Sequence, residues 1–288
     1  MDGVQLAVGQ SALAGLLLAI ARTAGFVLVT PPFNTRSVPM QARAGLAVAL
    51  ALPVSGILQA SAPALDSGAL LVQMVVQAVT GVALGFLVLA AVATLQAAGD
   101  LLDTVGGFSV SMALDPLMLV QASVLGRLHQ MTAAALLFVT DGHLMIVHGL
   151  TRSVALLPGG FSTWGEAARS ATDAVGTLLL GALQIAAPVV AAMLVTDVAL
   201  GLLTRAAPAL NAFSFSYPLK IFFTLLLAGL VVTRLPAGLE TAVRTQVVQI
   251  LRLVTPAAPG SPAPSRPGDP FGPSTATAGP TTAPVPGG

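Results

Sequence analysis

Residues 68–99 read GALLVQMVVQAVTGVALGFLVLAAVATLQAAG, without one charged side chain. A helix needs about 20 apolar residues to cross ~30 Å of hydrocarbon. This run is longer than that, and three others, at residues 3–21, 44–65 and 174–196, lack charge over a similar length. The sequence therefore predicts several membrane-spanning helices.

The composition of the whole chain agrees with a membrane class. Of its 288 residues 55% are hydrophobic and 8% are charged, and the mean hydropathy is +0.90. Soluble domains carry about 25% charged residues, because their surfaces face water. We expect an all-α integral membrane protein of about six apolar segments, at residues 11–31, 44–62, 68–98, 127–150, 174–203 and 213–234.

Charge and cysteine content exclude several functions. The net charge is +1 and the basic residues are scattered, so nucleic acid is not an expected partner. The chain has no cysteine, which excludes thiolate metal sites and a cysteine nucleophile. His143 and His148 are five positions apart, on different faces of a helix, so we expect no metal site and no cofactor. No Walker loop, GxSxG or HExxH motif is present, and we do not expect an enzyme.

The two ends of the chain differ in character. The N-terminus begins with Asp2, lacks a basic region and is expected to stay as the first helix. Residues 256–288 hold ten of the 21 prolines, with Gly, Ser, Thr and Ala between them. Such a segment cannot bury apolar surface. We therefore predict a helical membrane domain at 1–255 and a disordered tail at 256–288, with residues 239–254 as an amphipathic helix at the membrane surface.

Orientation by basic residues gives a conflict. Arg234, Arg244 and Arg252 after the sixth segment favour a cytoplasmic end there. Six full spans then place the N-terminus in the cytoplasm too, and leave Arg36 and Arg43 on the opposite side. This conflict indicates that the segments are not six ordinary spans.

Charged and polar residues interrupt the apolar segments. A charge at mid-bilayer costs ~2.5–3.5 kcal/mol on insertion scales, so such residues normally face protein or water. We expect them to be buried in a larger assembly. They are Arg22, Asp141, His143, Asp197, Arg205 and Lys220.

Each of these residues has a second interpretation. Arg22 either reaches toward an interface or forms an internal ion pair. Asp197 and Arg205 lie eight positions apart and share a helix face without touching, so helix packing is favoured over ion conduction. His143 beside Asp141 is either a proton relay or, as we prefer, a buried hydrogen-bonded pair.

Two glycine motifs stand out. Gly81 and Gly85 form a GxxxG, which lets two helices approach closely. The stretch at 103–108, DTVGGF, is apolar but too broken for a regular span and runs on to Asp115 and Pro116.

Several of these features occur together, in order, in one family. Residues 21–26 (ARTAGF), 31–33 (PPF), Arg36, 38–39 (VP) and Arg43 resemble the opening of the FliR family, called SctT in injectisomes. Residues 81–86, 96–99 (QAAG), 106–108, 115–116 and 141–143 resemble its central block, and Ser153 with Pro158 continues it. The most specific match is 185–189 and 197–211 (DVALGLLTRAAPALN), followed by 218–220 (PLK). The resemblance covers about residues 10–245.

The resemblance implies a subunit of the flagellar type III export gate, in the inner membrane at the flagellar basal body. Its implied partners are FliP-like and FliQ-like subunits, FlhB-like and FlhA-like subunits, membrane lipid and unfolded flagellar proteins as substrates. Residues 103–118 correspond to a plug in the pore of such a gate. The plug residues are Gly106, Gly107, Phe108, Met112, Asp115 and Pro116.

Two departures from the family pattern and three alternatives stay open here. Gln77 stands near a position where the family often carries an acidic residue, which leaves one polar contact undefined, and the Pro-rich tail is outside the pattern. The alternatives are an injectisome subunit, a small secondary transporter and a structural scaffold. A transporter predicts an inverted repeat and a midplane cluster of polar groups, and the sequence shows neither.

Overall fold

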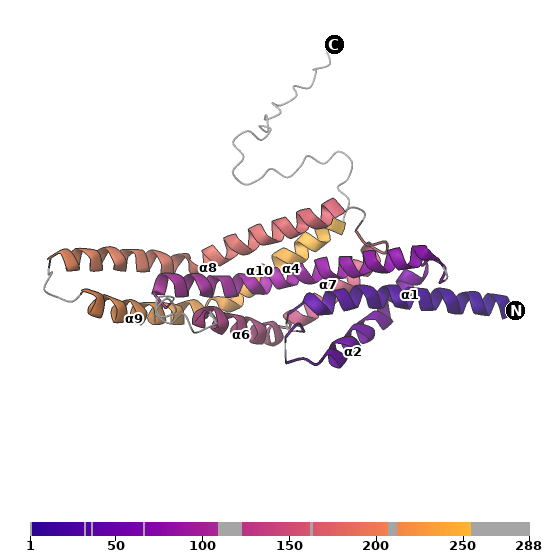
Figure 1. The fold of residues 1–288 in the computed structure, drawn as a ribbon, viewed down its shortest axis with the longest axis horizontal. Coiled ribbons are helices and arrows are strands. Elements are labelled where there is room, and N and C mark those ends of the chain that lie inside the picture. The colour runs from indigo at the N-terminus through magenta and orange to yellow at the C-terminus, as the bar shows by residue number, and fades with distance from the viewer. Residues whose placement is uncertain are drawn as a thin grey trace, which may run out of the picture. The chain divides into compact units, whose positions relative to one another are not determined.

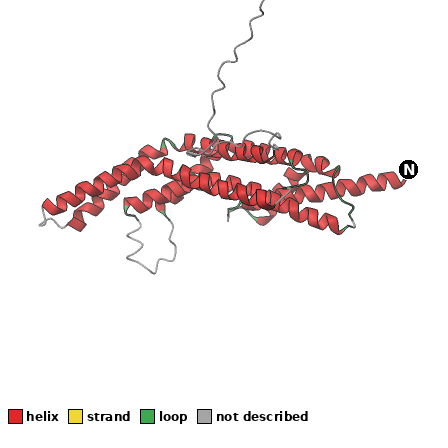
Figure 2. Ribbon diagram, turned by 90° about the horizontal axis from the view of Figure 1, so that it is seen from above, coloured by secondary structure: helices red, strands yellow, loops and turns green. Residues whose placement is uncertain are grey.

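The computed structural model describes residues 2–31, 33–35, 37–65, 67–108, 123–161, 164–206 and 212–254. Within these ranges the regular elements are helices and no strand occurs (Figure 1, Figure 2). The all-α fold predicted from hydropathy is therefore confirmed.

The helices follow one another along the chain with short connections. Their bounds are α1 (Asp2–Val29), α2 (Met40–Ala51), the 3₁₀ turn η1 (Leu52–Val54), α3 (Ser55–Gln59), α4 (Gly68–Gly106), α6 (Val124–Val139), α7 (Gly142–Leu156), α8 (Trp164–Ala206), α9 (Ala212–Val232) and α10 (Leu235–Val254). The second apolar segment is thus broken at Pro53, which starts the 3₁₀ turn between α2 and α3.

Helix α4 is the centre of the packing. It contacts α1, α6, α8, α9 and α10, and the main core cluster includes its residues from Leu84 to Leu102. In Figure 1 it runs through the middle of the helices, with α1 alongside it. A helix that is apolar on all sides is expected to be buried on most of them, and α4 fits that rule.

Glycines set the distance between α1 and α4. A Cβ at Gly81 would lie closer than 3.0 Å to the carbonyl oxygen of Arg22, and one at Gly25 would meet the carbonyl of Ala78. A Cβ at Gly85 would lie 2.9 Å from the carbonyl oxygen of Phe26. Only residues without a side chain let the two backbones come this close.

Among the residues that the structure describes, four helical stretches are long and apolar enough to cross a membrane. They are Gly9–Val29, Met40–Gln59, Gly68–Gly106 and Ala167–Ala206, and two bent helix pairs raise the number to six if each pair is one span. Helix α4, with 39 residues, is ~58 Å long at 1.5 Å per residue, which exceeds the ~30 Å hydrocarbon core. Helix α4 is therefore longer than one perpendicular crossing of the hydrocarbon core requires.

One expected span differs from the structure, whereas the sixth, expected at 213–234, matches α9 (Ala212–Val232). Residues 127–150 do not form one helix: the chain bends by 74° between α6 and α7, where Asp141 adopts φ +56°. The sixth segment ends at α9, and α10 leaves it at 58°. Leu235, Leu239 and Val243 of α10 are buried in the main core cluster, so this face of α10 packs on protein.

Helix α8 differs from α4 in exposure. Of its span only 22% is buried, against 56% for α4. Large apolar side chains such as Leu179, Leu183, Leu194 and Leu202 are exposed along it. Helices α8 and α9 lie side by side (Figure 1, Figure 2), and this pair presents apolar surface that the described chain leaves uncovered. A surface of this kind fits lipid or partner helices.

The close contact of α1 and α4 gives a first prediction. Gly81→Ala forces a methyl group against the backbone of α1 and should lower the stability of the chain by about 1–3 kcal/mol, a typical cost of overpacking. Thermal unfolding of the detergent-purified protein measures the loss. Gly9→Ala, on α1 where nothing lies within 4 Å, is the matched control and should be neutral or slightly stabilising. Equal melting temperatures for the two variants would contradict the packing argument.

Candidate functional site

The C-terminal end of α4 is the first part of the candidate site. The helix ends at Gly106, and Gly107 follows with φ +84° and donates its backbone N–H to the carbonyl of Asp103. The N–H of Phe108 donates to the same carbonyl at 3.1 Å. A residue with positive φ at this position is usually glycine, because a Cβ is strained there. The double glycine therefore stops α4 and turns the chain.

Asp103 connects this helix end to the start of α6. Its buried carboxylate accepts the backbone N–H of Leu125, with both oxygens 3.2 Å from the nitrogen. The first N–H groups of a helix lack intrahelical partners and carry partial positive charge, so a carboxylate there is stabilising. Ser123 caps the same helix, with its hydroxyl accepting from the N–H of Gly126 at 2.8 Å. One buried carboxylate thus holds α6 on α4.

Close backbone approach reinforces this junction. A Cβ at Gly99 would lie 2.6 Å from the carbonyl oxygen of Leu125, and a Cβ at Gly106 would lie 2.5 Å from the methyl carbon of Thr224. Gly99 therefore admits α6, and Gly106 admits α9. The last two turns of α4 are the point where three helices meet.

Some of the expected plug residues lie within the described residues, which end at Phe108 on this side, and others lie outside them. Gly106 and Gly107 end α4 as described, and the half-buried Phe108 packs against the main core cluster. Met112, Asp115 and Pro116 lie outside the described residues. The structure therefore describes the end of α4 before this segment and Ser123 after it.

Arg22 is the centre of a second polar site. It is fully buried in the apolar α1, although its side chain carries a charge. Nε donates to Oε1 of Gln77 at 2.6 Å, Nη1 to the carbonyl of Ser153 at 3.0 Å, and Nη2 to the carbonyl of Leu157 at 2.5 Å. One side chain of α1 therefore holds α4 and the end of α7 together.

No carboxylate pairs with Arg22 among the residues that the structure describes. Its guanidinium lies instead at the C-terminus of α7, where the carbonyls carry partial negative charge. The same carbonyls also accept backbone bonds, Ser153 from Leu157 at 2.9 Å and Leu157 from Gly160 at 3.0 Å. Arg22 therefore neither reaches toward a membrane interface nor forms an ion pair within the described residues. It is a buried cation at the C-terminal end of α7.

A polar stripe on α4 completes this site. Gln73, Gln77 and Thr80 follow at helical spacing and face the turn after α7. Gln77 donates to the carbonyl of Pro158 at 2.6 Å, and Gln73 donates to that of Gly159 at 3.0 Å. Thr80 accepts the N–H of Phe161 at 3.3 Å. The stripe was visible in the sequence as three polar residues on one face of an apolar helix, and the sequence analysis noted Gln77 alone.

Asp141 and His143 do not form the buried pair that we expected. Asp141 is exposed and stands before α7 in a left-handed conformation. Nδ1 of His143 is buried and makes no hydrogen bond within the described residues, and its ring lies 5.2 Å from that of Phe138. Asp141 lies at the 74° bend between α6 and α7. Its presence in the apolar segment therefore indicates a turn of the chain and not a buried hydrogen-bonded pair.

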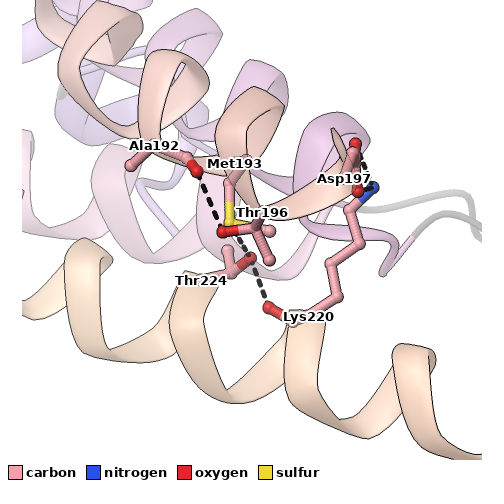
Figure 3. A network of polar contacts seen from close by, with 6 residues as sticks. All are labelled: Ala192, Met193, Thr196, Asp197, Lys220 and Thr224. Atoms are coloured by element: carbon pink, nitrogen blue, oxygen red, sulfur yellow. Dashed lines mark hydrogen bonds and ion pairs between the residues drawn. The ribbon is translucent and has the colours of Figure 1, made fainter. Parts of the chain in front are cut away.

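Asp197 pairs with Lys220 across α8 and α9. Nζ of Lys220 lies 2.8 Å from Oδ1 and 2.9 Å from Oδ2 of Asp197 (Figure 3). Arg205, two turns along α8, is exposed. Beside the pair, the buried hydroxyl of Thr224 donates to the carbonyl of Lys220 at 2.9 Å and lies 3.5 Å from Sδ of Met193 (Figure 3). The Asp197–Lys220 pair joins two helices, so the spacing of residues along one helix could not predict it.

Within the described residues no three His, Asp or Glu side chains come together as a metal site. The buried polar groups contact helix ends and neighbouring helices. This arrangement can fix where helices start, stop and turn.

Comparison with known proteins gives one family. Residues 13–245 match the model of bacterial export proteins, family 1. The chain is 30% identical to the flagellar biosynthetic protein FliR of Escherichia coli strain K12 over 203 residues, 70% of this chain and 78% of that protein. It is 29% identical to FliR of Bacillus subtilis strain 168 over 210 residues, 71% and 81% of the two chains.

The chain is also similar, over a comparable length, to a protein that is not named FliR. The surface presentation of antigens protein SpaR of Salmonella typhimurium is 28% identical over 214 residues, 72% of this chain and 78% of that protein. The matched region includes both the Arg22 site and the α4–α6 junction.

The Arg22 site yields a second prediction. Arg22→Leu leaves buried acceptors without their charged donor and should destabilise the chain by about 1–3 kcal/mol. Gln77→Leu should also destabilise, and the double variant should cost less than the sum, with a coupling of about 0.5–3 kcal/mol. Thermal unfolding of the four proteins measures the cycle.

The control for this cycle lies one residue before Ser153. Arg152 is exposed, so Arg152→Leu should change stability by less than about 0.5 kcal/mol. A loss at Arg22 no larger than that at Arg152 would overturn the assignment of Arg22 as an internal cation.

Proposed function

Because this chain belongs to the family of bacterial export proteins, family 1, we propose that it is a subunit of the flagellar type III export gate. The observation that carries the proposal is the match over residues 13–245, which extends from α1 into α10. In this role the chain forms part of the channel through which unfolded flagellar subunits leave the cell. We place it in the inner membrane at the flagellar basal body. Its role there is to let proteins pass through the channel, and it catalyses no reaction.

The exposed surface supports a role inside an assembly. Helix α4 buries most of its span, whereas α8 and α9 expose long apolar side chains such as Leu194, Leu202 and Phe222. Neighbouring apolar helices cover such faces in membrane complexes by close packing. FliP-like and FliQ-like subunits are the partners we propose for these faces, with FlhB-like and FlhA-like subunits as further components of the gate.

The end of α4 supports the plug at residues 103–118. A closing segment needs fixed anchors and a chain that turns sharply between them. The double glycine provides the turn, and Asp103 accepts the N–H of Leu125 in the first turn of α6, so both anchors lie at the end of α4. Apolar bulk such as Phe108 blocks ions by excluding water from a narrow constriction.

The flagellar role is tested by deleting the gene in its host. We expect cells that do not swim and release no filament protein into the medium, with both properties restored by a plasmid copy. Secretion is measured by immunoblotting the culture supernatant for filament protein, and swimming in soft agar. Normal swimming with normal filament release would overturn the flagellar assignment, and loss of virulence-protein secretion in the same strain would assign the chain to an injectisome, as in SpaR.

The plug is tested by ion leakage. Deleting residues 106–108 should depolarise the membrane of expressing cells, measured with a potential-sensitive dye, because the anchor of the closing segment is lost. Phe108→Gly should cause a smaller leak without shortening the chain. Deleting residues 280–282, outside the matched family region, is the control of equal length. Unchanged potential and export in both variants, at wild-type protein levels, would refute the plug.

A further inference from the structure

A groove separates α8 from the α9–α10 bend, away from both sites described above. Its volume is about 870 Å³, within the ~300–1,000 Å³ of small-ligand sites. Thr94 of α4 lines its inner side, with Gly181 and Pro188 of α8 and Leu230 and Gly238 across from them. Neither Arg22 nor Asp103 contributes to the lining.

The groove is apolar although several threonines line it. Their hydroxyls donate to carbonyls of their own helices: Thr94 to Ala90 at 2.9 Å, Thr241 to Ala237 at 2.8 Å and Thr245 to Thr241 at 2.8 Å. These hydrogen bonds satisfy the hydroxyl donors inside the chain. The surface offered to a ligand is therefore suited to hydrocarbon.

Arg234 is the charged residue of this lining. It is exposed, and within the described residues its guanidinium makes neither a hydrogen bond nor an ion pair. No acidic side chain lines the groove, and the nearby Glu240 of α10 pairs with Arg244 at 2.9 Å. The groove thus combines an apolar length with one available positive charge.

Arg234 lies at the bend between α9 and α10, two helices that together form one bent candidate span. It stands directly between α9, whose 21 residues extend ~31 Å and match the hydrocarbon thickness, and α10, which turns away by 58°. Helix α10 carries the exposed side chains of Glu240 and Arg244 on its outer face. Basic residues that follow a span favour the cytoplasmic side, where anionic lipid headgroups are concentrated.

We propose that this groove binds one anionic phospholipid, with an acyl chain between α8 and α10 and the phosphate on Arg234. A guanidinium binds phosphate through two parallel hydrogen bonds, which a neutral lining cannot offer. An inorganic anion would use Arg234 and leave the apolar length empty. An uncharged hydrocarbon would fill the length and leave Arg234 without a partner, so an amphiphile with a negative headgroup satisfies both features. The inference needs a membrane-spanning chain and is independent of the export role.

The test uses the full chain, purified in mild detergent and stripped of lipid. Native mass spectrometry then measures binding of dioleoylphosphatidylglycerol and of dioleoylphosphatidylcholine. We expect one tightly held phosphatidylglycerol per chain, bound about fivefold more strongly than phosphatidylcholine. Both lipids carry a phosphate, but the positive choline of phosphatidylcholine cancels its charge and repels Arg234, and one arginine near a net anionic headgroup contributes on that scale. Inorganic phosphate alone should give no comparable protection in thermal unfolding.

Matched variants separate this site from general surface charge. Arg234→Gln should remove the preference for phosphatidylglycerol, whereas Arg244→Gln, on α10 but outside the groove, should keep it. Ala237→Phe should fill the groove and weaken the binding of both lipids while the charge remains. Thermal unfolding without lipid checks that each variant is folded, and the two arginine variants decide the question if Ala237→Phe is not.

Four results would overturn the proposal. Equal binding of the two lipids, or an equal effect of the two arginine variants, would show nonspecific association. Protection by inorganic phosphate equal to that by phosphatidylglycerol would show an anion site only. A crosslink from position 234 to another subunit that excludes phosphatidylglycerol from the native complex would show that protein covers the groove.

Discussion

The burial of Arg22 is the constraint on which the N-terminal half of the chain depends. An arginine shielded from solvent requires hydrogen-bond acceptors arranged around it, and here they come from α4 and from the C-terminal end of α7. Because the negative partners are the carbonyls at the end of α7, the bend between α6 and α7 and the turn after α7 are needed to bring them into place. The glycines of α1 and α4 are needed as well, since the two backbones must approach closely for Arg22 to contact Gln77.

Much of the helical framework could be predicted from the sequence, because apolar length and glycine spacing are local properties. The run at 68–99 predicted an apolar membrane-spanning helix, and α4 extends it only to Gly106, before Gly107 with its positive φ. The break at Asp141 was harder, since a left-handed residue in an apolar segment depends on what α6 and α7 pack against. The Asp197–Lys220 pair joins two helices, and no periodicity on one helix predicts it. The partners of Arg22 were out of reach for the same reason, because two of them are main-chain carbonyls that every residue possesses.

The two longest helices, α4 and α8, make different kinds of contact. The polar side chains of α4 point inward, to Arg22, to the turn after α7 and to α6. They therefore make their hydrogen bonds within the chain. Helix α8 carries few internal polar contacts and exposes leucines along its length, so its remaining interactions are with lipid or other subunits. This division explains why basic-residue counting gave conflicting orientations: several apolar segments are built for protein contact, and insertion rules assume that each faces lipid.

A common device underlies the polar sites of this fold. Arg22 lies at the C-terminal carbonyls of α7, and Asp103 lies at the N-terminal N–H groups of α6, so each buried charge is matched to a helix end of opposite polarity. A side-chain ion pair would require two charges to be desolvated, whereas a helix end supplies half a unit of charge that the fold already contains. The device also couples position to secondary structure, because each charge is satisfied only while its helix starts or ends at the same residue. At the α4–α6 junction this coupling fixes both ends of the connecting segment, and any movement of that segment that unwinds the first turn of α6 removes the partner of Asp103.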